Sequence, residues 1–124
     1  MRFYQVIVRA TYEAACVFFQ RNLSVSDTIS TIHSTNEYIK ADNEDKAKKL
    51  AVKQVQNTYL EKSREFSPET LFHTFWDVAI KRRQKIKVNS VSQKDIEAVY
   101  IRELKAAEVL NHFPINDIAE VLLA

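Results

Sequence analysis

Glycine is absent from this chain of 124 residues, and cysteine and tryptophan occur once each. Without a residue that tolerates positive φ or close ligand approach, glycine-rich phosphate loops, dinucleotide-binding turns and EF-hand calcium loops are excluded. The single Cys16 has no internal disulfide partner, which favours a reducing compartment. The longest apolar run, residues 14–19, is far shorter than the roughly 20 residues of a membrane span, so we expect a cytoplasmic protein.

The composition indicates one ordinary folded domain that covers residues 1–124. Hydrophobic residues make up 46% of the chain and charged residues 27%, and no repeat or linker divides it. A chain of this length can bury a sizeable core without a metal or a disulfide. The net charge of +2 is too small to steer the whole molecule towards nucleic acid or acidic lipid.

The first 41 residues carry the pattern of a long β-hairpin. Every second residue from 4 to 18 is apolar or small, which is strand periodicity. A second extended stretch, rich in Thr, Ile and Tyr, covers about residues 28–41, and the two stretches can pair across the polar residues 20–26. In the competing interpretation residues 10–22 form a helix, because Ala14 and Ala15 favour one.

Helical patterns dominate the rest of the chain. Asp42 precedes a helix of about 18 residues, and Ser67 with Pro68 marks the start of a second helix. Residues 85–88 alternate as a short third strand, Ser92 with Asp95 predicts the start of a long helix reaching Leu110, and residues 115–123 form a short final helix. We therefore predict an α+β fold in which a long N-terminal antiparallel hairpin and a short third strand pack against three to four helices.

Turns that need left-handed geometry must be made without glycine. Asparagine and aspartate tolerate this conformation best among the other residues. Four asparagines stand at the expected junctions: Asn22, Asn57, Asn89 and Asn111.

No group of residues makes a convincing catalytic or metal site. Cys16 is in phase with the apolar face of the first strand, which is typical of a buried structural thiol. His73 and Asp77 are four positions apart on a helix, but no second ligand pair of zinc-site type accompanies them. The acidic residues 42–45 are explained by the start of a helix. We expect no enzyme activity, no metal and no cofactor.

The best candidate for a binding site is a basic segment near residue 85. It lies where a helix ends and the short third strand begins, so its side chains could line phosphates. A structural role explains these lysines equally well, since lysines on an exposed edge strand discourage aggregation. The segment comprises Lys81, Arg82, Arg83, Lys85 and Lys87.

Apolar helix surface supplies a second candidate, an interface for a protein partner. The helix after Pro68 is apolar around much of its circumference, and the last helix is amphipathic. The predicted interface residues are Phe72, Trp76, Ile118 and Leu122.

Together these patterns predict a small non-enzymatic protein that binds and modulates another protein, with homodimerisation possible. The short chain and its Lys- and Asn-rich composition are typical of accessory or inhibitor proteins of phages and mobile elements. The alternative is a nucleic-acid-binding protein that uses the basic segment 81–87.

Overall fold

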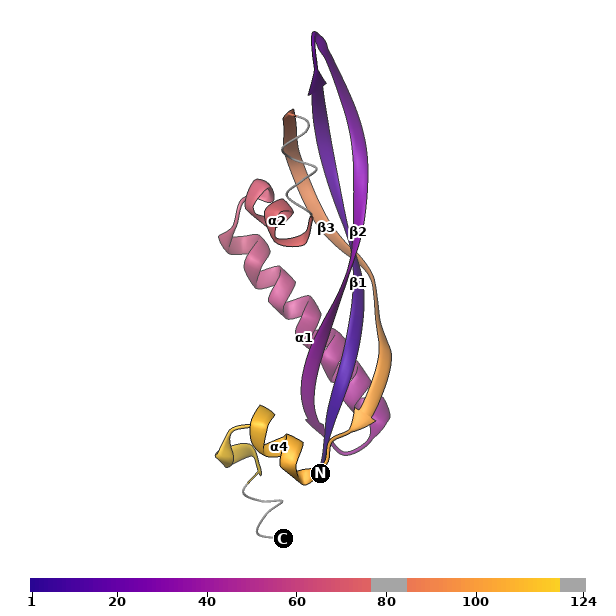
Figure 1. Ribbon diagram of the computed structural model, residues 1–124, viewed down its shortest axis with the longest axis vertical. Coiled ribbons are helices and arrows are strands. Elements are labelled where there is room, and N and C mark those ends of the chain that lie inside the picture. Colours follow the sequence, from indigo (N-terminus) through magenta and orange to yellow (C-terminus); the bar gives the residue numbers. More distant parts are fainter. Residues whose placement is uncertain (77–84, 119–124) are drawn as a thin grey trace. The chain divides into compact units, whose positions relative to one another are not determined.

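The computed structural model describes residues 1–76 and 85–118. Strands β1 (Arg2–Gln20), β2 (Leu23–Ala41) and β3 (Lys85–Glu103) form an antiparallel sheet in the order β2-β1-β3. The helices labelled in Figure 1 are α1 (Glu44–Glu65), α2 (Pro68–Phe75) and α4 (Ala106–His112). This architecture confirms the predicted α+β fold with its N-terminal hairpin. No helix in the described ranges is long and apolar enough to cross a membrane. Residues 115–118 are also helical.

β1 is one continuous strand of 19 residues, so the alternative helix over residues 10–22 is wrong. Side chains alternate between the two faces of a strand, and β1 lies between two partners. One face is therefore buried along nearly its whole length, and the sustained two-residue period outweighs the helical preference of two alanines. The buried residues of this face are Tyr4, Val6, Val8, Ala10, Tyr12, Ala14 and Cys16.

β3 also has 19 residues, so the helix predicted from Ser92 is wrong up to Glu103, and the third strand is longer than expected. Within it Asp95 has a φ of 50°. Val91 and Ile96 pack against the same core although five positions separate them, which would place them on opposite faces of a regular strand. A left-handed residue between them is typical of a β-bulge, which shifts the alternation by one position. This shift disguises the strand in the sequence.

The hairpin turn uses Arg21, and not the predicted Asn22, as its left-handed residue. Arg21 has a φ of 55°, and Asp95 is the other residue with positive φ in the described ranges. Asn57 lies in α1, Asn89 in β3 and Asn111 in α4, so those predictions are also wrong. A two-residue loop between paired strands needs positive φ at its first residue, whichever residue stands there.

Replacing Arg21 with glycine should therefore stabilise the hairpin turn. Glycine adopts positive φ without the steric cost that arginine has there, and we expect the free energy of unfolding to rise by up to about 1 kcal/mol. The matched control is Asn22→Gly, which relieves no strain and only makes the unfolded chain more flexible. Chemical denaturation of both variants compares them, and a loss of stability in Arg21→Gly would contradict the strained turn.

The described residues form two compact units, each with its own hydrophobic cluster. The first contains residues 1–8, 34–55 and those from 97 onward. In this unit Phe3 contacts Phe113 edge to face, with ring centroids 4.7 Å apart. Phe3 also packs with Leu104, Val109 and Ile118. The C-terminal helices are thus held by the first residues of β1.

The second unit contains residues 9–33 and 56–96. Ser67 accepts a hydrogen bond from the backbone N–H of Thr70 and Pro68 follows it, which confirms the predicted start of α2. α2 places Phe75 on the ring of Tyr12, with parallel rings and centroids 3.8 Å apart. Its buried cluster comprises Ala10, Tyr12, Ala14, Cys16, Phe72, Trp76 and Val88.

Candidate functional site

The predicted basic segment is only partly described. Lys81, Arg82 and Arg83 lie outside the described residues. Lys85 and Lys87 are exposed at the start of β3, which is an edge strand of the sheet. Lysines on an edge strand protect it from pairing with other chains, and the same side chains can contact phosphate. Phosphate binding by this segment stays a prediction.

The predicted apolar interface residues lie inside the two units. Phe72 and Trp76 belong to the cluster of the second unit and Ile118 to that of the first. Leu122 lies outside the described residues. None of the three described side chains presents a surface to a partner, and each contributes to the packing of its own unit.

The chemical candidates give no assembled site. Cys16 is buried, and its burial together with the carboxylates of Glu69 and Asp27 raises the pKa of its thiol, which opposes formation of a thiolate. His73 lies 3.9 Å from Glu69, and Asp77 lies outside the described residues. Among the residues that the structure describes, no three His, Cys, Asp or Glu side chains come together as metal ligands would.

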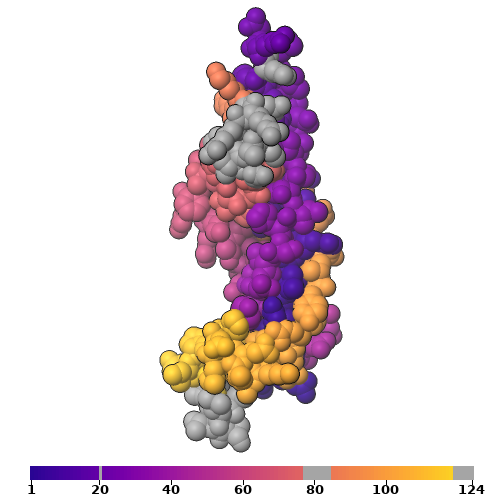
Figure 2. Space-filling model, in the orientation of Figure 1, coloured from indigo at the N-terminus to yellow at the C-terminus, as the bar shows by residue number. Residues whose placement is uncertain are grey.

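The structure reveals another candidate, which the sequence did not show: the outer edge of β2. No described strand pairs with this edge, because β1 takes the opposite side of β2. Residues 23–28 are exposed on both faces of the strand. The purple surface at the top of Figure 2 is this end of the hairpin. We refer to residues 23–33 of this side as the β2 edge, and all of them belong to the second unit.

The backbone of the β2 edge offers hydrogen-bonding groups at every second residue. A two-residue loop makes Gln20 and Leu23 a hydrogen-bonded pair, so odd-numbered residues of β2 turn their N–H towards β1 and even-numbered ones turn it outward. One outward group is already occupied, since the N–H of Thr28 donates to Oδ1 of Asp27 at 2.8 Å. The outward N–H groups of Ser24, Ser26, Ser30 and Ile32 are the ones left for an added strand.

Exposed apolar side chains accompany these backbone groups. Leu23, Val25 and Ile32 are 72%, 58% and 63% exposed, and Phe19 on the neighbouring strand is 43% exposed. Single exposed apolar residues are ordinary, but three of them within residues 23–32 of one edge strand, with Phe19 on the neighbouring strand, are typical of an interaction site. Their burial by a partner would add hydrophobic stabilisation to the backbone hydrogen bonds.

The two edges of the sheet differ in how they are protected. Natural edge strands are commonly blocked by lysine or proline. β3 carries the exposed Lys85 and Lys87 at its start. Residues 23–36 of β2 contain no Lys, Arg or Pro, and Asp27 is their one acidic residue. The β2 edge is thus the one suited to accept a strand.

A network of side chains fixes the edge at His33. The Nε2–H of His33 donates to the carbonyl of Phe75 at 2.8 Å, and the imidazole meets Phe75 and Tyr12 edge to face. Tyr12 accepts a hydrogen bond from Gln93, and Tyr59 donates to the carbonyl of Val91 at 2.7 Å. Burial raises the pKa of both tyrosines, which keeps their hydroxyls protonated as the network requires. The edge is therefore presented by a fixed scaffold.

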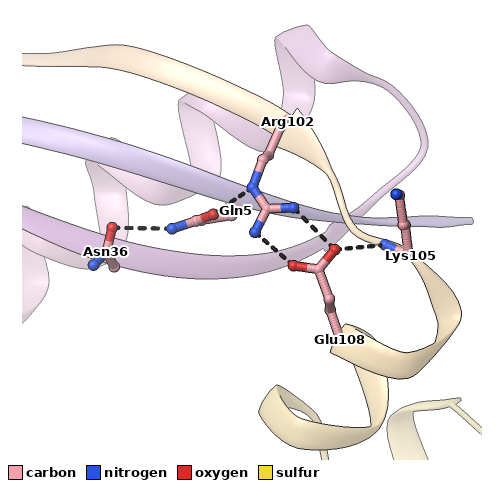
Figure 3. Close-up of polar contacts among 5 residues, drawn as sticks. All are labelled: Gln5, Asn36, Arg102, Lys105 and Glu108. Atoms are coloured by element: carbon pink, nitrogen blue, oxygen red, sulfur yellow. Dashed lines mark hydrogen bonds and ion pairs between the residues drawn. The ribbon is translucent and has the colours of Figure 1, made fainter.

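The other polar cluster of the structure, in the first unit, is a structural clamp (Figure 3). Arg102 donates two parallel hydrogen bonds to Glu108, at 2.9 and 2.5 Å, and its Nε donates to Gln5 at 2.7 Å. Gln5 in turn donates to Asn36 at 3.2 Å, while the N–H of Lys105 donates to Glu108. The charges of Arg102 and Glu108 are paired with each other, so the cluster ties α4 to the sheet.

The clamp predicts a dependence of stability on pH. The hydrogen bonds from Arg102 and from the Lys105 backbone lower the pKa of Glu108 from its usual 4.5 to about 2. A carboxylate with a depressed pKa in the folded state stabilises above its unfolded pKa, and this contribution is lost as the pH falls through the folded value. We expect the melting temperature to decline between about pH 4.5 and 2. In Glu108→Gln that decline should be shallower, and equal slopes would contradict the clamp.

Comparison of the chain with known proteins found no relative. No protein-family model matches the chain, and no curated protein or solved structure matches it significantly.

Proposed function

We propose that this protein acts by binding another polypeptide, an extended segment of which adds a strand to the β2 edge, and that it has no catalytic activity. The observation that carries the proposal is the exposure of residues 23–28 on both faces of an edge strand. In strand addition the backbone hydrogen bonds supply affinity and the alternating side chains supply specificity. The β2 edge offers both, through its outward N–H groups and its exposed apolar residues.

The test is capture of a partner from a cell lysate that has been treated with nuclease. Ser30→Pro removes an outward N–H at the middle of the β2 edge. Because this N–H does not bond to β1, the hydrogen bonds between β2 and β1 stay complete. We expect wild-type protein to retain a protein partner and Ser30→Pro to lose it. A partner that binds both equally well would refute binding at this edge.

The exposed Lys85 and Lys87 support a second candidate, binding of nucleic acid through the basic segment 81–87. The matched variant carries Lys85→Glu and Lys87→Glu, which reverse two charges and leave the β2 edge intact. Binding that nuclease removes, that falls steeply with salt and that this variant lacks would favour nucleic acid over a protein partner.

A further inference from the structure

We infer that the strand added to the β2 edge comes from a second copy of this chain, which pairs antiparallel with its own equivalent around Ser30. This inference rests on the proposed function, because it identifies the segment that the edge accepts. It follows from the charge pattern of the edge, from the bond that blocks Thr28 and from the symmetry of antiparallel pairing.

An antiparallel pair of identical edges is symmetric, so one residue faces its own copy and the flanking residues face each other reciprocally. On the β2 edge the even-numbered residues turn their N–H and C=O outward, so even residues pair with even residues. With Ser30 at the centre, Thr28 faces Ile32 of the second copy. Small hydroxyl side chains at the centre allow the two backbones to approach without a steric clash.

Charge favours this register. Directly opposed like charges destabilise a strand pair. A centre at Asp27 would place two carboxylates opposite each other, and a centre at Ile32 would place Asp27 opposite Glu37. A centre at Ser30 places Asp27 opposite His33 of the second copy. His33 is the single residue of 23–36 that can carry a positive charge.

The fixed position of His33 suits this pairing. A carbonyl can only accept a hydrogen bond, so the bond from His33 to Phe75 places a hydrogen on Nε2. Nδ1 is then the nitrogen left to meet the carboxylate of Asp27 from the second copy. The ring is held by aromatic contacts before the second copy arrives, so little conformational entropy is lost on pairing.

Asp27 changes partners in this scheme. In the single chain its Oδ1 accepts from the N–H of Thr28 and so blocks one outward donor. On pairing, that N–H donates to the carbonyl of Ile32 from the second copy, and the Asp27 carboxylate turns to His33. The blocking bond is local and exposed, so its exchange for a strand hydrogen bond has a small cost.

Cysteine cross-linking tests the register. Ser30→Cys places two thiols opposite each other, and a mild oxidant should convert most of the protein to a covalent dimer. The matched control Ser26→Cys is equally exposed, but its two copies lie eight positions apart along the strands, roughly 26 Å, and should not cross-link. Wild-type protein treated with the same oxidant shows how much cross-linking comes from the buried Cys16.

Sedimentation of the wild-type protein is the second measurement, and we expect a concentration-dependent dimer. A monomer at all concentrations, or equal cross-linking of Ser26→Cys and Ser30→Cys, would overturn the inference. A monomer that still captures a partner, and loses it with Ser30→Pro, would overturn the self-pairing and leave the proposed function standing. Wild-type protein that neither captures a partner nor forms a dimer would refute both proposals.

Discussion

Replacing Phe72 with alanine should lower the free energy of unfolding by about 3–5 kcal/mol, the usual cost of removing a buried aromatic ring. Phe72 is 1% exposed, and its ring stacks on Trp76 with centroids 4.9 Å apart. Alanine would leave a cavity against β1 that the sheet cannot close, because a strand paired on both sides moves little. Chemical denaturation monitored by circular dichroism measures the effect.

The control for this prediction is Phe66→Ala, which truncates a phenylalanine that is 42% exposed. It should cost about 1 kcal/mol or less, because little apolar area is lost from the core. If Phe72→Ala were no more destabilising than Phe66→Ala, the ring would not be a core residue. Phe72 would then again be a candidate for the protein interface that the sequence predicted.

The hairpin could be predicted from the sequence because its signal is local. The alternation over residues 4–18 arises from one buried face of β1, and a strand buried on one face repeats every two residues. The starts of α1 and α2 could be predicted in the same way. Ser67 with Pro68 begins α2 as predicted, whereas α1 is capped by Asn43, whose Oδ1 accepts from the N–H of Lys46, and not by the predicted Asp42. These elements depend on neighbours in the chain more than on distant contacts.

β3 could not be predicted beyond residue 88 because its character depends on a distant partner. Residues 92–103 form a strand by pairing with β1, about 90 positions earlier in the chain, as the bonds from Gln93 to Tyr12 and from Arg102 to Gln5 show. The pattern of Ser92 and Asp95 is also a good helix start. Tertiary pairing outweighs that local preference, and the bulge at Asp95 removes the alternation that would have revealed the strand.

The candidate site was hidden for a related reason. Whether Leu23 and Val25 face a core or water depends on which strand lies beside β2, and the order β2-β1-β3 is a property of the whole sheet. The binding sites predicted from the sequence were the basic segment 81–87 and the apolar helix surfaces. One signal was available, namely the lack of Lys, Arg and Pro over residues 23–36, but it becomes meaningful only once β2 is known to be an edge.

Two proline variants of adjacent residues test the geometry on which both proposals depend. Thr31→Pro should lower the free energy of unfolding by about 2–4 kcal/mol, since it removes an N–H that is directed at β1 and leaves a carbonyl of β1 without its donor. Ser30→Pro should change it much less, because the N–H of Ser30 faces outward and proline is tolerated there. Denaturation curves of the two variants give the comparison.

Amide hydrogen exchange of the wild-type protein provides an independent check of the same geometry. The N–H of Thr31 should be protected by its bond to β1, whereas that of Ser30 should exchange rapidly in dilute protein and become protected when the β2 edge is occupied. If Ser30→Pro proved the more damaging variant, the odd-numbered residues would face outward. Every pairing inferred around Ser30 would then shift by one residue, which would move the side chains of the edge to the opposite face of the sheet.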